Sequence, residues 1–397
     1  MATNPALNPL APVAREVPHT VSPGLWALAW KRLQSDRVGM VSLAIVAAFL
    51  VMMALSGSGL IAGDWSKETG VNYAPPSFIG ADIEAGAPAA PEGVTTPAAG
   101  PAVEYKSTVV DPLADALADI RGEKKVPATE AAPAGTDTGK SVDPLADIMA
   151  DIRAGAKKDA NVAEARASTL PLGGDKWGRD VLKKTIKGSE TSIFVGLAAA
   201  AVAVFIGTIF GALAGYYGRW VDDFFNWFYS IFSSIPYLLL ILAVAAVLQQ
   251  KGIHTIILIL GLTGWTGVFR LIRGEYLKHK GREYVQAADA IGASNARRMF
   301  VHIFPNVSHV VLVQLSILAV GFIKAEVILS FLGFGVPVDV VSWGSMLNEA
   351  QNELILGKWW QLAAAGTAMA ILVTAFSLFT DALRDALDPK LKGRMGA

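Results

Sequence analysis

Six long apolar segments constrain what this chain can fold into more than any other feature. A helix that crosses the hydrocarbon core of a bilayer needs roughly 20 apolar residues, because it rises about 1.5 Å per residue. Such segments raise the share of hydrophobic residues in the 397-residue chain to 53%. We predict an all-α integral membrane protein with about six transmembrane helices, at residues 38–55, 191–215, 225–248, 255–272, 307–332 and 362–380.

Basic residues predict which side of the membrane each loop occupies. The formal net charge is zero, but Lys and Arg are concentrated at a few places. Lys31, Arg32 and Arg37 directly precede the first apolar segment, which by the positive-inside rule predicts a cytoplasmic N-terminus. Residues 274–305 and the C-terminal tail are also basic, and a count of six spans puts both on the same cytoplasmic side.

Residues 61–170 interrupt the apolar pattern and are predicted to form a long extracytoplasmic insert. They are rich in Ala, Pro, Gly, Asp and Glu and are never apolar for long enough to span a membrane. Residues 111–122 recur in similar form at 143–153, each copy starting with Asp-Pro and continuing with apolar residues at helical spacing. The insert is either two short amphipathic helices on flexible linkers or a spacer with nascent helices.

No residue pattern predicts catalysis. The chain has no cysteine, which excludes disulfides and thiolate metal sites. The histidines show no metal-ligand spacing, and no nucleophile and base are paired. Residues 134–141 fit a relaxed phosphate-binding loop, but an Ala/Pro-rich linker precedes them and Pro144 follows, where a working loop needs a strand and a helix. We therefore predict a non-enzyme with no catalytic, cofactor-binding or metal residues.

The loop at 274–305 is the most informative polar region. Residues 283–292 are predicted to form a short helix that Gly292 ends, because glycine permits a sharp exit. The small Ala287 and Ala288 would let a partner approach the helix backbone closely, as in a helix held in a groove. Pro305 fits the first turn of the following span. From this chemistry alone, either a partner-binding helix or an ordinary solvated loop helix is consistent with the sequence.

Four motifs in order resemble a known family. The loop is similar to the Glu-Ala-Ala loop of bacterial ABC-importer permeases. The runs PLGGDKWGRD at 171–180, LSFLGFG at 329–335 with WGSML at 343–347, and DALRDALDP at 381–389 resemble signatures of the oligopeptide/dipeptide type, the OppC/DppC-like permeases. The resemblance covers the N-terminal part loosely and nearly everything from Pro171 onward.

This resemblance implies a type I ABC-importer permease architecture in the bacterial cytoplasmic (inner) membrane, with both termini cytoplasmic. Together with the apolar and charge patterns it gives five regions: a cytoplasmic N-terminus with an interfacial helix (1–37), a first transmembrane helix (38–60), the extracytoplasmic insert (61–170), a permease core of five spans with the coupling loop 274–305 (171–385), and a cytoplasmic tail (386–397). The insert is much longer than the family's usual extracytoplasmic loop, so the resemblance does not cover it.

The implied function is the membrane pathway for di- or oligopeptides. The implied partners are a second homologous permease, two ATP-binding-cassette ATPase subunits, an extracytoplasmic peptide-binding protein and the lipid bilayer, but no nucleic acid. ATP and Mg²⁺ would bind only to the ATPases, so this chain would need no cofactor.

The resemblance also assigns residues. The ATPase-coupling residues would be Glu283, Tyr284, Gln286, Ala287, Ala288, Gly292 and Pro305. Gln286 departs from the family, which usually has Glu there, so the charge of a salt bridge to the ATPase would be lost.

Three further residues are candidates because they are unusual within a span. Glu326 is a charged residue inside the fifth span, and family members commonly have a Glu there, so it could line the pathway or a gate. The other possibility is that Glu326 snorkels to the interface, with Lys324 as an interfacial anchor or as its partner. Pro236 should kink the third span and could line the pathway.

Other functions stay open at this point. The same architecture could import another solute, such as nickel or an oligosaccharide. A stand-alone secondary transporter is a second class, although internal sequence halves are not evident. A membrane-anchored interaction protein that works through its insert is a third.

Overall fold

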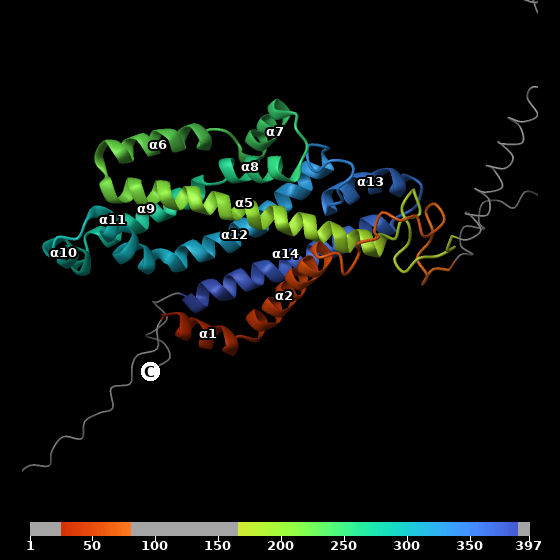
Figure 1. Ribbon diagram of the computed structural model, residues 1–397, viewed down its shortest axis with the longest axis horizontal. Coiled ribbons are helices and arrows are strands. Elements are labelled where there is room, and N and C mark those ends of the chain that lie inside the picture. The colour runs from red at the N-terminus through yellow and green to blue at the C-terminus, as the bar shows by residue number, and fades with distance from the viewer. Residues whose placement is uncertain (1–24, 81–165, 388–397) are drawn as a thin grey trace, which may run out of the picture. The chain divides into compact units, whose positions relative to one another are not determined.

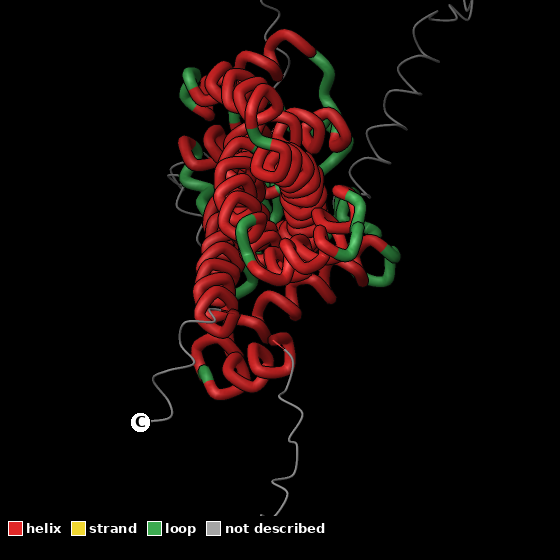
Figure 2. The backbone as a smooth tube through the Cα atoms, turned by 90° about the vertical axis from the view of Figure 1, so that its left-hand side faces the viewer, coloured by secondary structure: helices red, strands yellow, loops and turns green. Residues whose placement is uncertain are grey.

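The described part of this computed structural model consists of helices and loops. It comprises residues 25–80 and 166–387, and within them only isolated β-bridges and no strand occur (Figure 2). Residues 25–80 and 167–387 belong to one compact unit. The predicted repeats at 111–122 and 143–153 and the run at 134–141 lie outside the described residues.

Among the described residues, four helical segments are long and apolar enough to cross a membrane, and two bent helix pairs bring the number to six if each pair counts as one span. The prediction of an all-α membrane protein is confirmed. The helices are α1 Leu25–Ser35, α2 Arg37–Gly57, α5 Val181–Tyr217, α6 Arg219–Ser233, α7 Tyr237–Leu248, α8 Ile253–Thr263, α9 Thr266–Lys280, α10 Glu283–Ala290, α11 Asn295–Arg297, α12 Phe304–Phe331, α13 Trp343–Ile355 and α14 Trp360–Leu387, with a π-helix η2 at Arg298–Ile303.

Helix α5 lies at the centre of the bundle and packs along α9, α12, α8 and α2 (Figure 1). Small residues on α5 permit the close approach to α9. A Cβ atom added to Gly207 would lie 2.7 Å from the carbonyl oxygen of Trp265, and one added to Gly215 would lie 2.6 Å from that of Arg273. Small residues at helix interfaces are typical of membrane bundles, because van der Waals packing replaces the hydrophobic effect there.

The helices α10 and α13 lie at opposite ends of the bundle (Figure 1). We call these the α10 end and the α13 end. At the α13 end, residues 58–80 and 167–180 fold together over the helices: the Thr69 N–H donates to the Gly178 carbonyl at 3.1 Å, and the Ser77 N–H donates to the Leu170 carbonyl at 2.8 Å. The two edges of the predicted insert therefore belong to the same compact unit as the helices.

Two other elements differ from expectation. Helix α5 begins at Val181, ten residues before the predicted start at 191, because the Asp180 carboxylate caps its first turn. Helix α13 was not predicted. It begins with a capping box, in which the side chains of Ser342 and Ser345 each accept a hydrogen bond from the other residue's backbone N–H. The third helical position of such a box usually holds Glu or Gln, and because Ser345 stands there instead, the sequence pattern is hard to recognise.

Candidate functional site

Two inner side chains hold α10 against the bundle. Val285 and Ala288 are 3% and 4% exposed, and their spacing of three residues puts them on one side of the helix. Val285 joins a buried cluster that includes Met299 and Ile303 of η2. The sequence led us to expect that Ala287 and Ala288 would both face a partner. Ala287 is exposed, but Ala288 is buried by this chain itself.

The outer side of α10 leaves polar and apolar groups uncovered. The exposed predicted residues there are Glu283, Tyr284, Gln286 and Ala287. Ile291, directly after the helix, is 84% exposed, and Phe300 and Val301 of η2 are 50% and 60% exposed. Exposed apolar groups rimmed by polar ones are typical of a protein interaction site. Sequence reasoning missed Ile291. The only sequence signal for it was its position, as an isolated apolar residue directly before the glycine that ends the helix.

The polar side chains of α10 also close its turn with α9. The Gln286 Nε2 donates to the Gly281 carbonyl oxygen at 3.3 Å, and the Tyr284 hydroxyl bonds the His279 Nδ1 at 2.8 Å. An ionised Glu at position 286 would have no proton to donate to that carbonyl. Gln286, which replaces the family's usual Glu, therefore makes a hydrogen bond to Gly281 that an ionised Glu could not make.

Gly292 ends α10 in a left-handed conformation, with φ of +83° and open space where a Cβ would lie. Its conformation, rather than a lack of space, therefore requires glycine. The next N–H, that of Ala293, donates to the Ala288 carbonyl at 3.0 Å and satisfies one of the last carbonyls of the helix.

The segment after α10 is tied to the central helix α5. Arg298 pairs with Asp289 of α10 and donates to the Asn295 Oδ1 at 2.6 Å. The same Oδ1 accepts from the Tyr216 hydroxyl at 3.0 Å, and Tyr216 lies in the last turn of α5. Sequence reasoning did not connect Asn295 with Tyr216, because the two residues are 79 positions apart.

Pro305 lies in the first turn of α12 but does not begin a separate helix. The chain is helical without interruption from Asn295 to Phe331, where the sequence predicted a start at 307. The π-helix η2 makes this possible, since its wider turn lets the Phe304 N–H reach back to the Met299 carbonyl just before the proline. Pro305 is exposed.

Glu326 is fully buried, which excludes snorkelling to the interface. Its Oε1 accepts from the Ser330 hydroxyl at 2.6 Å, and its Oε2 has no partner among the described residues. The Ser192 hydroxyl of α5 also lies beside it and accepts from the Trp343 N–H at 3.2 Å. In this single chain, Glu326 thus lies where α12, α5 and the start of α13 meet.

Lys324 and Pro236 occupy different settings. Lys324 is exposed and has no ion pair with Glu326, because residues two apart point to different sides of a helix. It lines a cavity that Asp381 also lines. Around Pro236 the chain breaks, rather than kinks, into α6 and α7, which meet at 84°. Pro236 is exposed and forms the N-cap of α7.

The α13 end contains a buried ion cluster that sequence reasoning missed. The Lys184 Nζ lies 2.8 Å from the Asp175 Oδ2 and 2.5 Å from the Glu349 Oε2, and it donates to the Gln361 Oε1 at 3.1 Å. Lys184, Asp175 and Gln361 are at most 1% exposed. The only sequence signal was Asp175 itself, within the run at 171–180.

Glu353 of α13 adds a further carboxyl group to this region. It is 1% exposed, and neither carboxylate oxygen has a hydrogen-bond partner among the described residues. Burial is the main cause that raises the pKa of Glu353 to about 7. The negative charges of Asp175 and Glu349 raise it further, whereas the positive charge of Lys184 lowers it. In the described ranges, no group of three or more His, Cys, Asp or Glu residues is arranged to hold a metal ion.

Known proteins match both the helical core and the N-terminal region. Residues 207–393 match the family described as binding-protein-dependent transport system inner membrane component. Residues 24–76 match the N-terminal TM domain of oligopeptide transport permease C. The first match includes α10, and most of the insert lies between the two.

Individual relatives agree with the family matches. The chain is 38% identical over 221 residues to the dipeptide transport system permease protein DppC of Bacillus subtilis, covering 56% of this chain and 69% of that protein. It is 38% identical over 221 residues to the oligopeptide transport system permease protein OppC of the same organism, covering 56% and 72%. For OppC of Haemophilus influenzae the identity is 36% over 219 residues, covering 55% and 70%. The chain therefore belongs to the oligopeptide/dipeptide permease family of ABC transporters, which are multi-pass inner-membrane components of binding-protein-dependent transport systems.

Proposed function

We propose that this chain is a permease subunit of an ATP-driven peptide importer. With a second, related permease it forms the pathway for di- or oligopeptides that an extracytoplasmic binding protein delivers. The observation that carries the proposal is α10, a short helix held on two buried residues, with exposed apolar groups, at one end of a membrane bundle. The names of the relatives support peptides as the cargo.

The proposal places the α10 end in the cytoplasm. Support comes from the basic residues around α10, since cytoplasmic loops carry an excess of Lys and Arg. They are Lys278, Lys280, Arg282, Arg297 and Arg298. Two ATP-binding-cassette ATPases would dock here and bind the ATP and Mg²⁺. Both chain termini would be cytoplasmic as well.

Coupling would run through the contacts of α10 with the rest of the chain. The Asp289–Arg298 pair and the Asn295–Tyr216 hydrogen bond join α10 to α5, and η2 continues directly into α12. A displacement of α10 would therefore act on two long helices at once. For ATP to bias the pathway, the ATPases must bind α10 with different free energies in the two states of the permease.

The test uses the assembled complex and the exposed residue Ile291. We expect Ile291→Asp to weaken ATPase association about thirtyfold, the effect of losing an interface hot spot of about 2 kcal/mol. Uptake of a labelled dipeptide should fall with it. Val338→Asp is the matched control, because Val338 is also an exposed apolar residue, 93% exposed, but lies between α12 and α13. ATPase retention is measured by quantitative co-purification.

Normal ATPase retention and uptake in the Ile291→Asp complex would refute the docking role of α10. The cargo is tested separately, by competing labelled dipeptide uptake with unlabelled peptides, nickel or oligosaccharides. Competition by nickel or oligosaccharide, but not by peptides, would refute the peptide assignment and leave the coupling result intact.

A further inference from the structure

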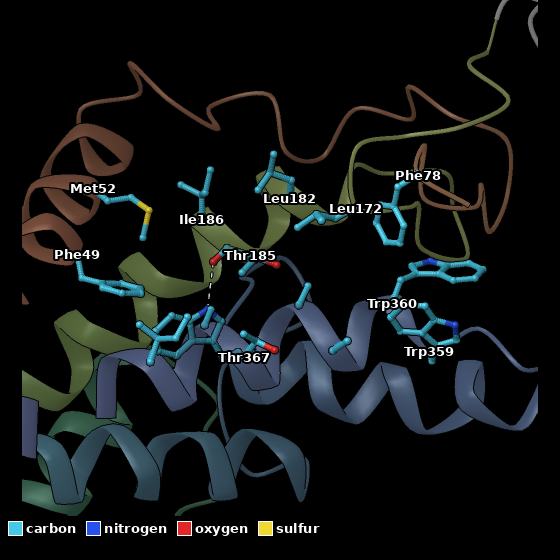
Figure 3. A pocket seen from close by; sticks show the side chains of 15 residues that line it. Phe49, Met52, Phe78, Leu172, Leu182, Thr185, Ile186, Trp359, Trp360 and Thr367 are labelled. Atoms are coloured by element: carbon cyan, nitrogen blue, oxygen red, sulfur yellow. Dashed lines mark hydrogen bonds between the residues drawn. The ribbon is translucent and has the colours of Figure 1, made fainter. Parts of the chain in front are cut away.

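An apolar groove follows the line where α2 meets α14. Near the α13 end it is a cavity of about 440 Å³, lined by Phe49 and Met52 of α2, by Leu182 and Ile186 of α5 and by Thr367 of α14 (Figure 3). Nearer the α10 end it continues as a cavity of about 640 Å³. Ile371 lines both cavities, so they adjoin at this residue, and we call the two together the groove.

The residue sizes on the two helices explain the groove. On α2 its wall is a stripe of large apolar residues at helical spacing, Val38, Val41, Ile45, Phe49 and Met52. On α14 the lining includes the small residues Ala363, Thr367, Ala370 and Thr374, beside the larger Trp359, Ile371 and Leu378. The small residues of α14 leave space beside the large residues of α2. From 37 to 52 the α2 side is about 22 Å long at about 1.5 Å per residue, a large part of the roughly 30 Å hydrocarbon core.

A positive charge lies at the α10-side end of the groove. Arg37 lines this end and is exposed, with no ion pair among the described residues. Its neighbour Asp36 uses one carboxylate oxygen to cap the Val38 N–H at 3.0 Å. A guanidinium group presents a planar fork of donors that matches a phosphate.

Helix α1 indicates the depth at which Arg37 lies. Ala29 and Leu33 of α1 are buried in a cluster with residues of α14, while Trp26 and Trp30 are each 51% exposed. Exposed tryptophans on an amphipathic helix are typical of the headgroup layer. Because α2 begins two residues after α1 ends, Arg37 lies in the same layer, where lipid phosphates are found.

We propose that this groove binds an anionic phospholipid, with its phosphate on Arg37 and an acyl chain between α2 and α14. With the orientation proposed above, the lipid comes from the cytoplasmic leaflet. A helix of a partner protein fits less well, because an apolar helix would leave the guanidinium group unpaired. The site is additional to peptide transport and to ATPase docking.

The experiment uses the assembled transporter in nanodiscs that contain phosphatidylglycerol with a photoreactive acyl chain. We expect Arg37→Gln to reduce labelling of this chain about fivefold, the factor that corresponds to about 1 kcal/mol per basic side chain at a membrane surface. Lys31→Gln is the matched control, since Lys31 is an exposed cation of α1 that does not line the groove. Thr374→Phe, which fills the groove, should also reduce labelling.

Equal losses for Arg37→Gln and Lys31→Gln would show diffuse surface attraction and overturn the proposal. So would labelling as strong with photoreactive phosphatidylcholine as with phosphatidylglycerol, or full labelling of Thr374→Phe. A photoreactive amino acid placed at Val41 gives an independent check, because it should capture lipid. Capture of the second permease instead would assign the groove to a subunit interface.

Discussion

The two ends of the bundle are stabilised in opposite ways. At the α10 end, a short helix rests on two buried side chains and is otherwise exposed. At the α13 end, a buried lysine joins two carboxylates and an amide from α5, α13, α14 and the run at 171–180. An element that few buried contacts hold can move at low cost, whereas a buried ion network tolerates little change. The comparison indicates a mobile end and a rigid end.

The largest effect should follow from breaking the rigid end. We expect Lys184→Met to destabilise the protein by about 3–5 kcal/mol, because it leaves the buried Asp175 and the partly buried Glu349 without their cation. The measurement is thermal unfolding of the complex in nanodiscs. Lys183→Met is the control, since Lys183 pairs with Asp64 at 2.7 Å with both side chains more than one third exposed. If both variants unfold at the same temperature, the α13 end is not the rigid one.

The next effect should be a pH dependence at the same end. Because the pKa of Glu353 rises from 4.5 to about 7 on folding, the folded state holds its proton more tightly than the unfolded state does. Folding stability should therefore decrease as the pH rises from about 4.5 to about 7, and this loss should level off above that range. Glu353→Gln should flatten the profile. A profile unchanged by Glu353→Gln would show that other groups cause the dependence.

A smaller effect is expected at the mobile end, confined to α10. Gly292→Ala should weaken the helix by about 1–2 kcal/mol, because a side chain disfavours the left-handed conformation. Gly281→Ala is the matched control, since Gly281 has an ordinary φ of −86° and open space around it. Amide hydrogen exchange of residues 283–290 should speed up only in Gly292→Ala. Equal exchange in the two variants would contradict the role given to Gly292.

The smallest effect concerns the departure at position 286. Gln286→Glu loses the hydrogen bond to the Gly281 carbonyl and gains a charge near the helix N-terminus, where it is favoured by about 0.3–1 kcal/mol. These effects nearly cancel, so stability should change by less than about 0.5 kcal/mol. ATPase affinity, measured at low and high salt, should rise slightly at low salt only. A large loss of uptake would show that the amide itself is required.

Much of the fold and part of the candidate site could be predicted from the sequence. Long apolar runs and four motifs indicated a multi-pass permease, which the matches confirm. The short helix after residue 282 was also expected, since local signals determine it. The burial of Ala288 and Glu326 was not expected, because burial depends on which distant segment covers a residue.

The sequence by itself determined the membrane class, the family, and the places where the chain must turn or break, such as Gly292 and Pro236. Those properties follow from runs of apolar residues and from local backbone preferences. Only the tertiary structure decided which charges meet. Lys184 and Glu349 are 165 positions apart in the chain, and Arg298 reaches Tyr216 through Asn295. Such pairs form only when helices pack together, and a local sequence pattern does not show which helices pack.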